Sequence, residues 1–171
     1  MRVDGFAPGG SDQRRFENAL QEPYWLLWRV GIDTGLRIGD LLQMRVCDVL
    51  ALVGGITVLE KKTGKTRKVR LSPVTAARLI AYTARMPLNG YVWDSPAKPG
   101  QPIARQSVWR VYKKAASGSK NIGTHSARKT FAQKLYKKTD LETVQETFDH
   151  KYPSTTLLYV INPRTKKNRP R

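Results

Sequence analysis

Two histidines, His125 and His150, are the only imidazoles in this chain, and both stand beside residues suited to phosphoryl chemistry. His125 opens the tetrapeptide His-Ser-Ala-Arg, which ends at Arg128, and Tyr159 follows His150 after eight intervening residues. A further arginine, Arg37, lies far upstream. Guanidinium groups bind phosphate oxygens through a planar, permanently charged fork, and a tyrosine hydroxyl can act as a nucleophile. The set therefore predicts metal-free attack on a phosphodiester, and DNA cleavage is the first hypothesis.

His125 and Arg128 are three residues apart, so on a helix expected over residues 125–137 they would be neighbours. Together an imidazole and a guanidinium suit an anion such as phosphate. For so short a pattern taken alone, the commoner interpretation is a histidine at a helix end and a solvated arginine. Arg37 has Asp40 three residues on. That carboxylate either orients the guanidinium toward a ligand or forms an ordinary surface ion pair, which contributes little.

Tyr159 competes with other tyrosines for the role of nucleophile. Tyr152 is the nearest rival, two residues after His150, but it immediately precedes Pro153 at an expected helix boundary. The unperturbed pKa of a phenol is about 10, so a nucleophilic tyrosine needs nearby cations to stabilise the charge that develops in the transition state. The chain has those cations, and Tyr159 is the preferred nucleophile.

Lys62 stands at the tip of an expected hairpin, where a lysine is either solvated or able to reach a leaving oxygen as a general acid. Two neighbouring lysines compete for that role. Basic residues elsewhere are candidates for contacts with DNA phosphates. The full set of candidate DNA-binding residues is Lys61, Lys65, Arg105, Lys113, Lys114 and Lys129.

The charge balance favours a polyanionic partner. Lys and Arg total 31 against 13 Asp and Glu, a formal net charge of +18 over 171 residues. Residues 1–60 carry a net charge of −2 and residues 61–171 a net charge of +20. The basic part therefore holds both histidines and Tyr159, which points to nucleic acid before an anionic membrane. The single cysteine, Cys47, excludes a disulfide within the chain, and its apolar neighbours predict a buried thiol.

The pattern predicts one mainly α-helical domain with a small three-stranded antiparallel sheet. Strands are expected at residues 46–52, 56–61 and 67–71, with turns at Gly54-Gly55 and Thr63-Gly64-Lys65. Residues 86–104 carry several prolines and are expected to be mostly loop. Helices are expected over residues 12–20, 23–32, 37–42, 73–85, 105–117, 125–137, 141–148 and 153–159. No apolar run is long enough for a membrane span, so a cytoplasmic protein is expected.

The order of these motifs resembles the catalytic domain of the tyrosine recombinases, also called the phage integrase family. Residues 34–48 are similar to the family's first-arginine box and residues 62–65 to its lysine-bearing hairpin. Residues 124–132 resemble the second box. Residues 141–159, with Ser154-Thr-Thr before the tyrosine, resemble the closing stretch. Each motif is weak alone, but the ordered set is specific and covers about residues 12–162.

The resemblance implies a role for each member of the set. Tyr159 would attack the scissile phosphate and form a 3′-phosphotyrosyl link, which a 5′-hydroxyl later reseals without ATP or metal. Arg37 and Arg128 would hold the non-bridging oxygens. His125 would handle the nucleophile's proton, and Lys62 would protonate the leaving 5′-oxygen. His150 would hydrogen-bond the phosphate.

Two departures from the family pattern stand close to these residues. Asp40 occupies a position where the family often has Glu, which is a mild change. Asp149 precedes His150 where the family often has Gly, and its charge either weakens phosphate binding or orients a neighbour.

The resemblance implies a site-specific DNA recombinase of the integrase, excisionase or invertase type, with no cofactor. Its partners would be a double-stranded DNA recombination site and further copies of the chain, a tetramer on paired sites and a monomer without DNA, in a nucleoid-associated setting. A type IB topoisomerase-like nicking-closing enzyme and a non-catalytic DNA-binding protein are the alternatives. Residues 1–11 are expected to be a flexible N-terminus, 12–162 the catalytic domain and 163–171 a basic tail. The chain would be either a fragment of a larger integrase or a single-domain recombinase.

Overall fold

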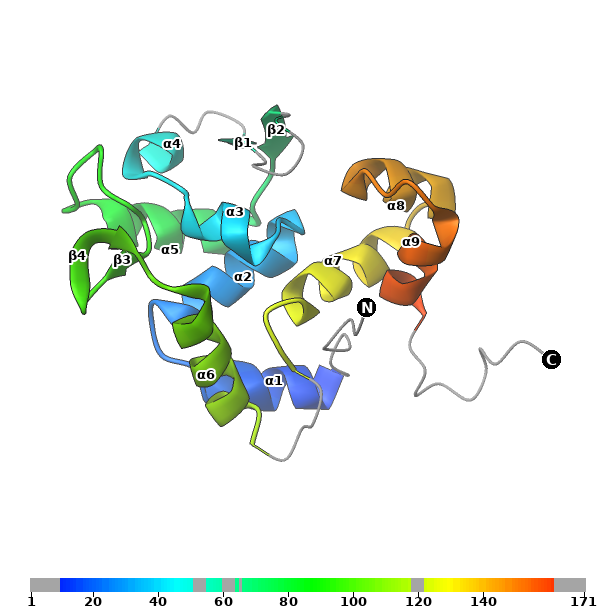
Figure 1. Cartoon of the computed structure of the whole chain (residues 1–171), viewed down its shortest axis with the longest axis horizontal. Coiled ribbons are helices and arrows are strands. Elements are labelled where there is room, and N and C mark those ends of the chain that lie inside the picture. The colour runs from blue at the N-terminus through cyan, green and yellow to red at the C-terminus, as the bar shows by residue number, and fades with distance from the viewer. Residues whose placement is uncertain (1–9, 51–54, 60–63, 65, 118–121, 162–171) are drawn as a thin grey trace.

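The computed structural model describes residues 10–50, 55–59, 64, 66–117 and 122–161. Helices dominate this part of the chain, as the sequence predicts (Figure 1). The helices are α1 (Gly10–Asn18), α2 (Tyr24–Thr34), α3 (Ile38–Leu42), α4 (Val46–Leu50), α5 (Pro73–Thr83), α6 (Arg105–Ala115), α7 (Ser126–Tyr136), α8 (Leu141–Phe148) and α9 (Pro153–Val160). The strands are β1 (Ile56–Leu59), β2 (Thr66–Val69), β3 (Asp94–Ser95) and β4 (Lys98–Pro102).

The first expected strand is wrong, because α4 occupies most of residues 46–52. The carboxylate of Asp48 accepts a hydrogen bond from the backbone N–H of Arg45 at 2.9 Å, which is the acidic half of a capping box at the start of the helix. Val46 and Val49 are both fully buried, and their spacing of three suits one face of a helix. The valines were therefore helix-core residues rather than a strand signal.

The described residues hold two separate two-stranded sheets, so a three-stranded sheet is not confirmed. Strands β1 and β2 pair antiparallel, with Ile56 opposite Val69 and Leu59 opposite Thr66. Strands β3 and β4 form a second antiparallel pair in the proline-rich region that was expected to be mostly loop. Pro96, Pro99 and Gly100 in this region are turn signals, so the sequence pattern did not reveal the pair.

The larger core joins the N-terminal helices to α6. Phe16 of α1, Trp28 of α2 and Tyr112 of α6 meet edge to face, with ring centroids 4.7 to 5.6 Å apart. The indole N–H of Trp28 donates to a carboxylate oxygen of Glu17 at 3.0 Å, so the buried ring keeps a polar partner. Burial raises the pKa of the Tyr112 phenol above its ordinary value. Cys47, expected to be buried, is exposed because it lies on the outer side of α4.

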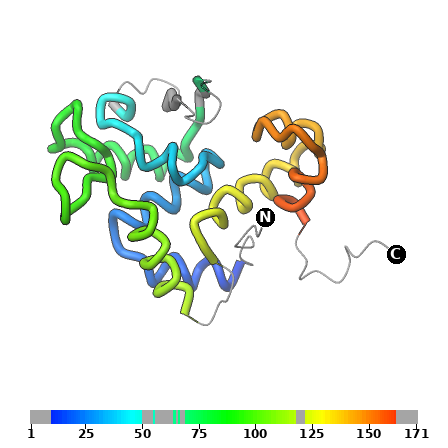
Figure 2. Tube along the Cα trace, in the orientation of Figure 1, coloured from blue at the N-terminus to red at the C-terminus, as the bar shows by residue number. Residues whose placement is uncertain are grey.

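A smaller core lies under the last three helices. Ala132, Val144, Phe148 and Val160 form this second cluster, and Tyr159 packs against it. Figure 2 shows α7, in yellow, running between the blue and cyan N-terminal helices and the orange pair α8 and α9. Helix α7 therefore links the two cores. Helices α2 and α7 approach closely, since a Cβ on Gly31 would lie 3.0 Å from Cβ of Ala127.

Within the described ranges, no helix is both long enough and apolar enough to span a bilayer.

Candidate active site

The turn between α2 and α3 places Arg37. Gly35 ends α2 in the left-handed region at φ 66°, and its N–H donates to the carbonyl of Gly31 at 2.9 Å. A side chain there would be strained by that φ and would also overlap the ring of Phe131. The hydroxyl of Thr34 accepts from the N–H of Leu36 at 3.3 Å, which stiffens the turn. Arg37 then stands at the N-cap of α3 with a half-buried side chain.

Arg128 connects this turn to the end of α8, just before His150. Its side chain is only 3 % exposed, and its guanidinium donates to the carbonyl of Gly35 at 2.6 Å and to that of Phe148 at 3.4 Å. The guanidinium carbon also lies 4.0 Å from the centroid of the Phe148 ring. Arg128 is thus held against backbone two residues from Arg37 and two residues from His150. The predicted grouping of these three segments is present in the fold.

His150 and Tyr159 lie together, as their spacing predicts. Their ring centroids are 5.0 Å apart with an interplanar angle of 56°. Phe148 contacts both, at 5.4 Å from His150 in a stacked arrangement and at 5.7 Å from Tyr159. The rings of His150 and Tyr159 therefore rest on the same phenylalanine that supports Arg128.

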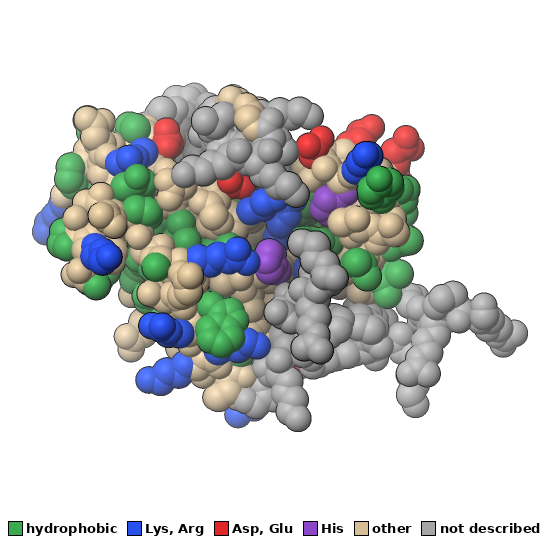
Figure 3. All heavy atoms as spheres, in the orientation of Figure 1, with side chains coloured by type: hydrophobic (Ala, Val, Ile, Leu, Met, Phe, Trp, Pro, Cys, Tyr) green, Lys and Arg blue, Asp and Glu red, His purple; other side chains and the backbone are tan. Residues whose placement is uncertain are grey.

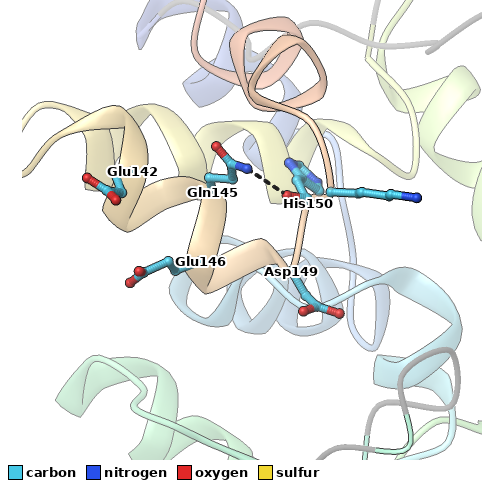
Figure 4. Close-up of a pocket in the computed structure, with 6 residues that line it drawn as sticks. Glu142, Gln145, Glu146, Asp149 and His150 are labelled. Atoms are coloured by element: carbon cyan, nitrogen blue, oxygen red, sulfur yellow. Dashed lines mark hydrogen bonds between the residues drawn. The ribbon is translucent and has the colours of Figure 1, made fainter.

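Two polar contacts hold His150. Its Nδ1 lies 3.1 Å from the hydroxyl of Thr156, which is fully buried in α9. The side-chain amide of Gln145 donates to the backbone carbonyl of His150 at 3.0 Å (Figure 4). Both the ring and the backbone of His150 are therefore fixed by neighbouring helices. The hydroxyl of Thr156 can donate to Nδ1 or accept from it, so it orients the ring with the proton on either nitrogen.

His125 contacts an arginine from another helix. Nε2 of His125 lies 3.1 Å from a terminal guanidinium nitrogen of Arg105, at the start of α6. The imidazole is half-buried and Arg105 is exposed. The sequence placed Arg105 among the DNA-binding candidates and did not predict this contact, because twenty residues separate the pair.

Lys129 is another cation beside the predicted nucleophile. It is 3 % exposed, and its ammonium nitrogen lies 5.9 Å from the ring centroid of Tyr159. The rival Tyr152 is 58 % exposed and has Lys151 over its ring at 5.5 Å. Tyr159 is therefore the tyrosine that packs among the site residues. Lys129 is buried beside the Tyr159 ring. A contact between Lys129 and DNA stays a prediction.

Asp40 and the lysines of the hairpin are the remaining residues that the sequence predicts for the site. Asp40 is buried in α3, three residues from Arg37, and its supporting role stays a prediction. Lys61, Lys62 and Lys65 lie outside the described residues. The strands on either side of these lysines, β1 and β2, do pair in the predicted hairpin arrangement.

An acidic pocket of about 500 Å³ lies beside His150 (Figure 4). Its acidic lining residues are Glu142, Glu146 and Asp149. Asp149 ends α8 in the left-handed region at φ 52°, and its N–H donates to the carbonyl of Glu146 at 3.0 Å. A residue with a side chain is strained in that region, whereas glycine is not. Asp149 is thus a helix cap in a conformation that glycine adopts more readily.

Basic side chains gather on the face that carries the histidines. Figure 3 shows Lys and Arg side chains beside the two purple histidine side chains, and several acidic side chains at the upper right. Helix α6 begins with Arg105, which lies against His125, and Lys113 and Lys114 near the end of the helix are also exposed. Trp109, 48 % exposed, has the ammonium of Lys113 at 5.9 Å from its ring centroid. This face combines cations with an exposed aromatic ring.

Several residues that hold the site were not singled out from the sequence. Phe148 supports three predicted members at once, Gly35 supplies a carbonyl to Arg128, and Gln145 holds the His150 backbone. Thr156 had a signal, since it ends the Ser-Thr-Thr run before the tyrosine. Phe148 had none, because an apolar residue near a helix end is ordinarily a core residue.

A comparison with protein-family models shows which family the chain belongs to. The model of the phage integrase family matches residues 15–165. The chain belongs to the phage integrase family. Among family relatives, the probable integrase/recombinase YoeC of Bacillus subtilis (strain 168) is 34 % identical over 139 residues, covering 80 % of this chain and 76 % of YoeC. The tyrosine recombinase XerD of Staphylococcus saprophyticus is 32 % identical over 135 residues, covering 74 % of this chain and 45 % of XerD.

Solved structures of integrases and Xer recombinases show the same fold. The crystal structure of XerA recombinase superposes with a TM-score of 0.73 at 20 % identity, covering 100 % of this chain and 66 % of that one. A lambda integrase dimer bound to a COC′ core site gives 0.70 at 20 % identity, covering 100 % of this chain and 64 % of that one. The chain spans about half the length of the XerD relatives that it matches. Family membership favours a recombinase over a nicking-closing enzyme or a non-catalytic DNA-binding protein.

Proposed function

We propose that this chain is the catalytic domain of a site-specific DNA recombinase that cleaves and rejoins DNA through a 3′-phosphotyrosyl intermediate. Residues 12–162 form the proposed domain, and 163–171 a basic tail. The observation that carries the proposal is the cluster in which Arg128, His150 and Tyr159 all contact Phe148. Family membership supports the same chemistry.

In the proposed reaction, the hydroxyl of Tyr159 attacks the scissile phosphorus and the 5′-oxygen leaves. Arg37 and Arg128 hold the non-bridging oxygens, and His150 donates to the same phosphate. The burial of Arg128 strengthens its attraction for the developing negative charge, because few waters screen it. A fixed guanidinium also needs little reorganisation during the reaction. His125 takes the proton of Tyr159, and Lys62 supplies one to the leaving oxygen.

The proposed substrate is double-stranded DNA bound on the histidine-bearing face. Arg105, Lys113 and Lys114 of α6 are the described residues proposed to contact phosphates, with Lys61, Lys65 and Lys129 as further candidates. Trp109 adds an apolar surface to the same helix. The net charge of +18 supports the attraction to DNA and a nucleoid-associated location.

Assembly on DNA is part of the proposal. One structural neighbour is a lambda integrase tetramer bound to a Holliday junction, with a TM-score of 0.71 at 18 % identity. We propose that copies of this chain likewise act as a tetramer on paired sites. Exchange of strands between two duplexes requires several active sites to act together, whereas relaxation of one duplex requires only one.

The test is a covalent trap. Purified protein is mixed with a library of duplexes that carry a nick close to a randomised target region, in EDTA and without ATP. Adducts that survive denaturing detergent are isolated and their DNA is sequenced. Tyr159→Phe should abolish the adduct, since the ring remains and only the nucleophilic oxygen is lost.

Tyr152→Phe is the matched control and should retain the adduct. An adduct that persists in Tyr159→Phe but vanishes in Tyr152→Phe would show that the wrong tyrosine has been assigned. Absence of any adduct across the library would instead favour a DNA-binding protein without catalysis.

A further inference from the structure

The contact between Arg105 and His125 has a consequence for the protonation of the imidazole. Arginine stays protonated at every physiological pH and offers only donors. At 3.1 Å from the guanidinium nitrogen, Nε2 of His125 must therefore present its lone pair. A proton on Nε2 would place two N–H groups against each other. In the neutral ring, the remaining proton then sits on Nδ1.

We propose that Arg105 is a positioning residue that keeps the proton off Nε2 of His125 before DNA binds. The proposal rests on the proposed function, in which His125 accepts the proton of Tyr159. The exposed guanidinium of Arg105 is also placed to pair with a DNA phosphate. Phosphate is the stronger partner for a guanidinium, because it is charged and imidazole is neutral.

DNA binding then makes Nε2 of His125 available as a general base. When the phosphate draws Arg105 away, the Nε2 lone pair becomes available. The proton of the Tyr159 hydroxyl moves to Nε2 while the tyrosine oxygen bonds to phosphorus and the bond to the 5′-oxygen breaks. The ring becomes an imidazolium that carries protons on both nitrogens. Without Arg105, Nε2 loses the donor that keeps a proton away from it, and a ring that carries its proton on Nε2 is in the wrong state to accept another there.

The first test needs no DNA and no activity. Protein labelled with ¹⁵N in its histidines has only two imidazoles, so a spectrum of His150→Gln assigns both. At a pH where the ring is neutral, we expect the His125 proton on Nδ1 and the lone pair on Nε2. In Arg105→Met, the proton should redistribute toward Nε2, and Arg105→Lys, which still donates, should retain the wild-type pattern.

Arg110→Met is the matched control, because it removes the same charge from the same exposed helix five residues away. It should leave the His125 pattern unchanged. A wild-type spectrum with the proton on Nε2, or no difference between wild type and Arg105→Met, would overturn the proposal. Neither outcome bears on whether Tyr159 cleaves DNA.

The second test separates positioning from simple DNA binding. Single-turnover cleavage is measured with protein in saturating excess over the trapped duplex. Arg105→Met should lower the rate constant at least about tenfold. This loss is smaller than the full contribution of a general base, because His125 itself is still present. In a His125→Ala background the same substitution should cause no further loss. Equal losses in both backgrounds would mean that Arg105 acts on the phosphate alone and would overturn the proposal.

Discussion

Gly35 helps to position both arginines of the site. Its positive φ turns the chain from α2 toward Arg37, its carbonyl accepts from Arg128, and its missing side chain makes room for Phe131. One backbone position thus sets the direction of one arginine and holds the other. Such a position tolerates no substituent, for reasons of both conformation and space.

Gly35→Ala should lower the free energy of unfolding by at least about 2 kcal/mol, because alanine pays the left-handed penalty and meets the Phe131 ring. Urea denaturation measures the change. Gly39→Ala is the control, since a Cβ there meets nothing within 4 Å and Gly39 lies inside α3. That variant should be more stable than wild type by about 0.5 to 1 kcal/mol. Comparable loss in both variants would contradict the argument.

Asp149 combines a left-handed backbone conformation with a carboxylate next to His150. Asp149→Gly should raise the free energy of unfolding by up to about 1 kcal/mol, because glycine adopts the left-handed cap without strain. It should also tighten DNA binding. Asp149→Asn removes the charge and keeps the side chain, so it should improve binding with a smaller gain in stability. Denaturation and fluorescence anisotropy with a labelled duplex separate the two effects.

At the scale of elements, caps place the helices that carry the site. Asp140 accepts from the backbone N–H of Thr143 at 2.7 Å at the start of α8, and Ser72 performs the same task for α5. Helix α8 ends one residue before Asp149, so the register of this helix sets where His150 lies. Loss of the Asp140 cap at the N-terminus of α8 would therefore loosen the C-terminal end of the helix, which His150 follows.

The Asp140 cap predicts a pH dependence of stability. Hydrogen bonds from Thr143 lower the pKa of the Asp140 carboxyl below its ordinary value. Its contribution is therefore complete above the ordinary pKa of about 4 and is lost as pH falls through the lowered pKa. Asp140→Ala should be less stable than wild type at pH 7, and the difference should shrink below about pH 4.

Asp140→Asn keeps a capping acceptor without a titrating charge. Its difference from Asp140→Ala should stay constant with pH, since neither side chain ionises. Thermal unfolding at a series of pH values measures all three proteins. A wild-type advantage over Asp140→Ala that does not change with pH would contradict the role of the charged carboxylate.

At the scale of the whole molecule, charge is separated over the surface. The histidine-bearing face is basic and the pocket beside α8 is acidic (Figures 3 and 4). DNA lying on the basic face would be repelled from the acidic edge. We expect this charge distribution to orient a bound duplex as well as attract it.

DNA binding should weaken steeply as salt concentration rises, because phosphate contacts release counterions. If Lys113 makes one such contact, Lys113→Met should reduce the slope of log affinity against log salt by about 0.9. The control is Arg78→Met on α5, whose guanidinium carbon lies 4.4 Å over Trp25, and it should leave the slope unchanged. Binding that is insensitive to salt would contradict the proposed interface.

Most of the helices and the family followed from the sequence, since both depend on short-range signals. The Ser72-Pro73 start of α5, the Asp140 cap and Pro153 mark helix ends locally. The ordered motifs around Arg37, His125 and Tyr159 carried the family resemblance. Local signals were insufficient at α4, where valines suit a strand or a helix, and at the short pair β3 and β4.

Only the tertiary structure decided how the site is held together. Arg128 donates to a carbonyl 93 residues away, and Arg105 meets His125 across 20 residues. Phe148 became the common support of Arg128, His150 and Tyr159 only when α7, α8 and α9 packed around one small core. No local pattern encodes such contacts, because they depend on which helix faces meet. Sequence therefore determined which groups are present, and packing determined which of them touch.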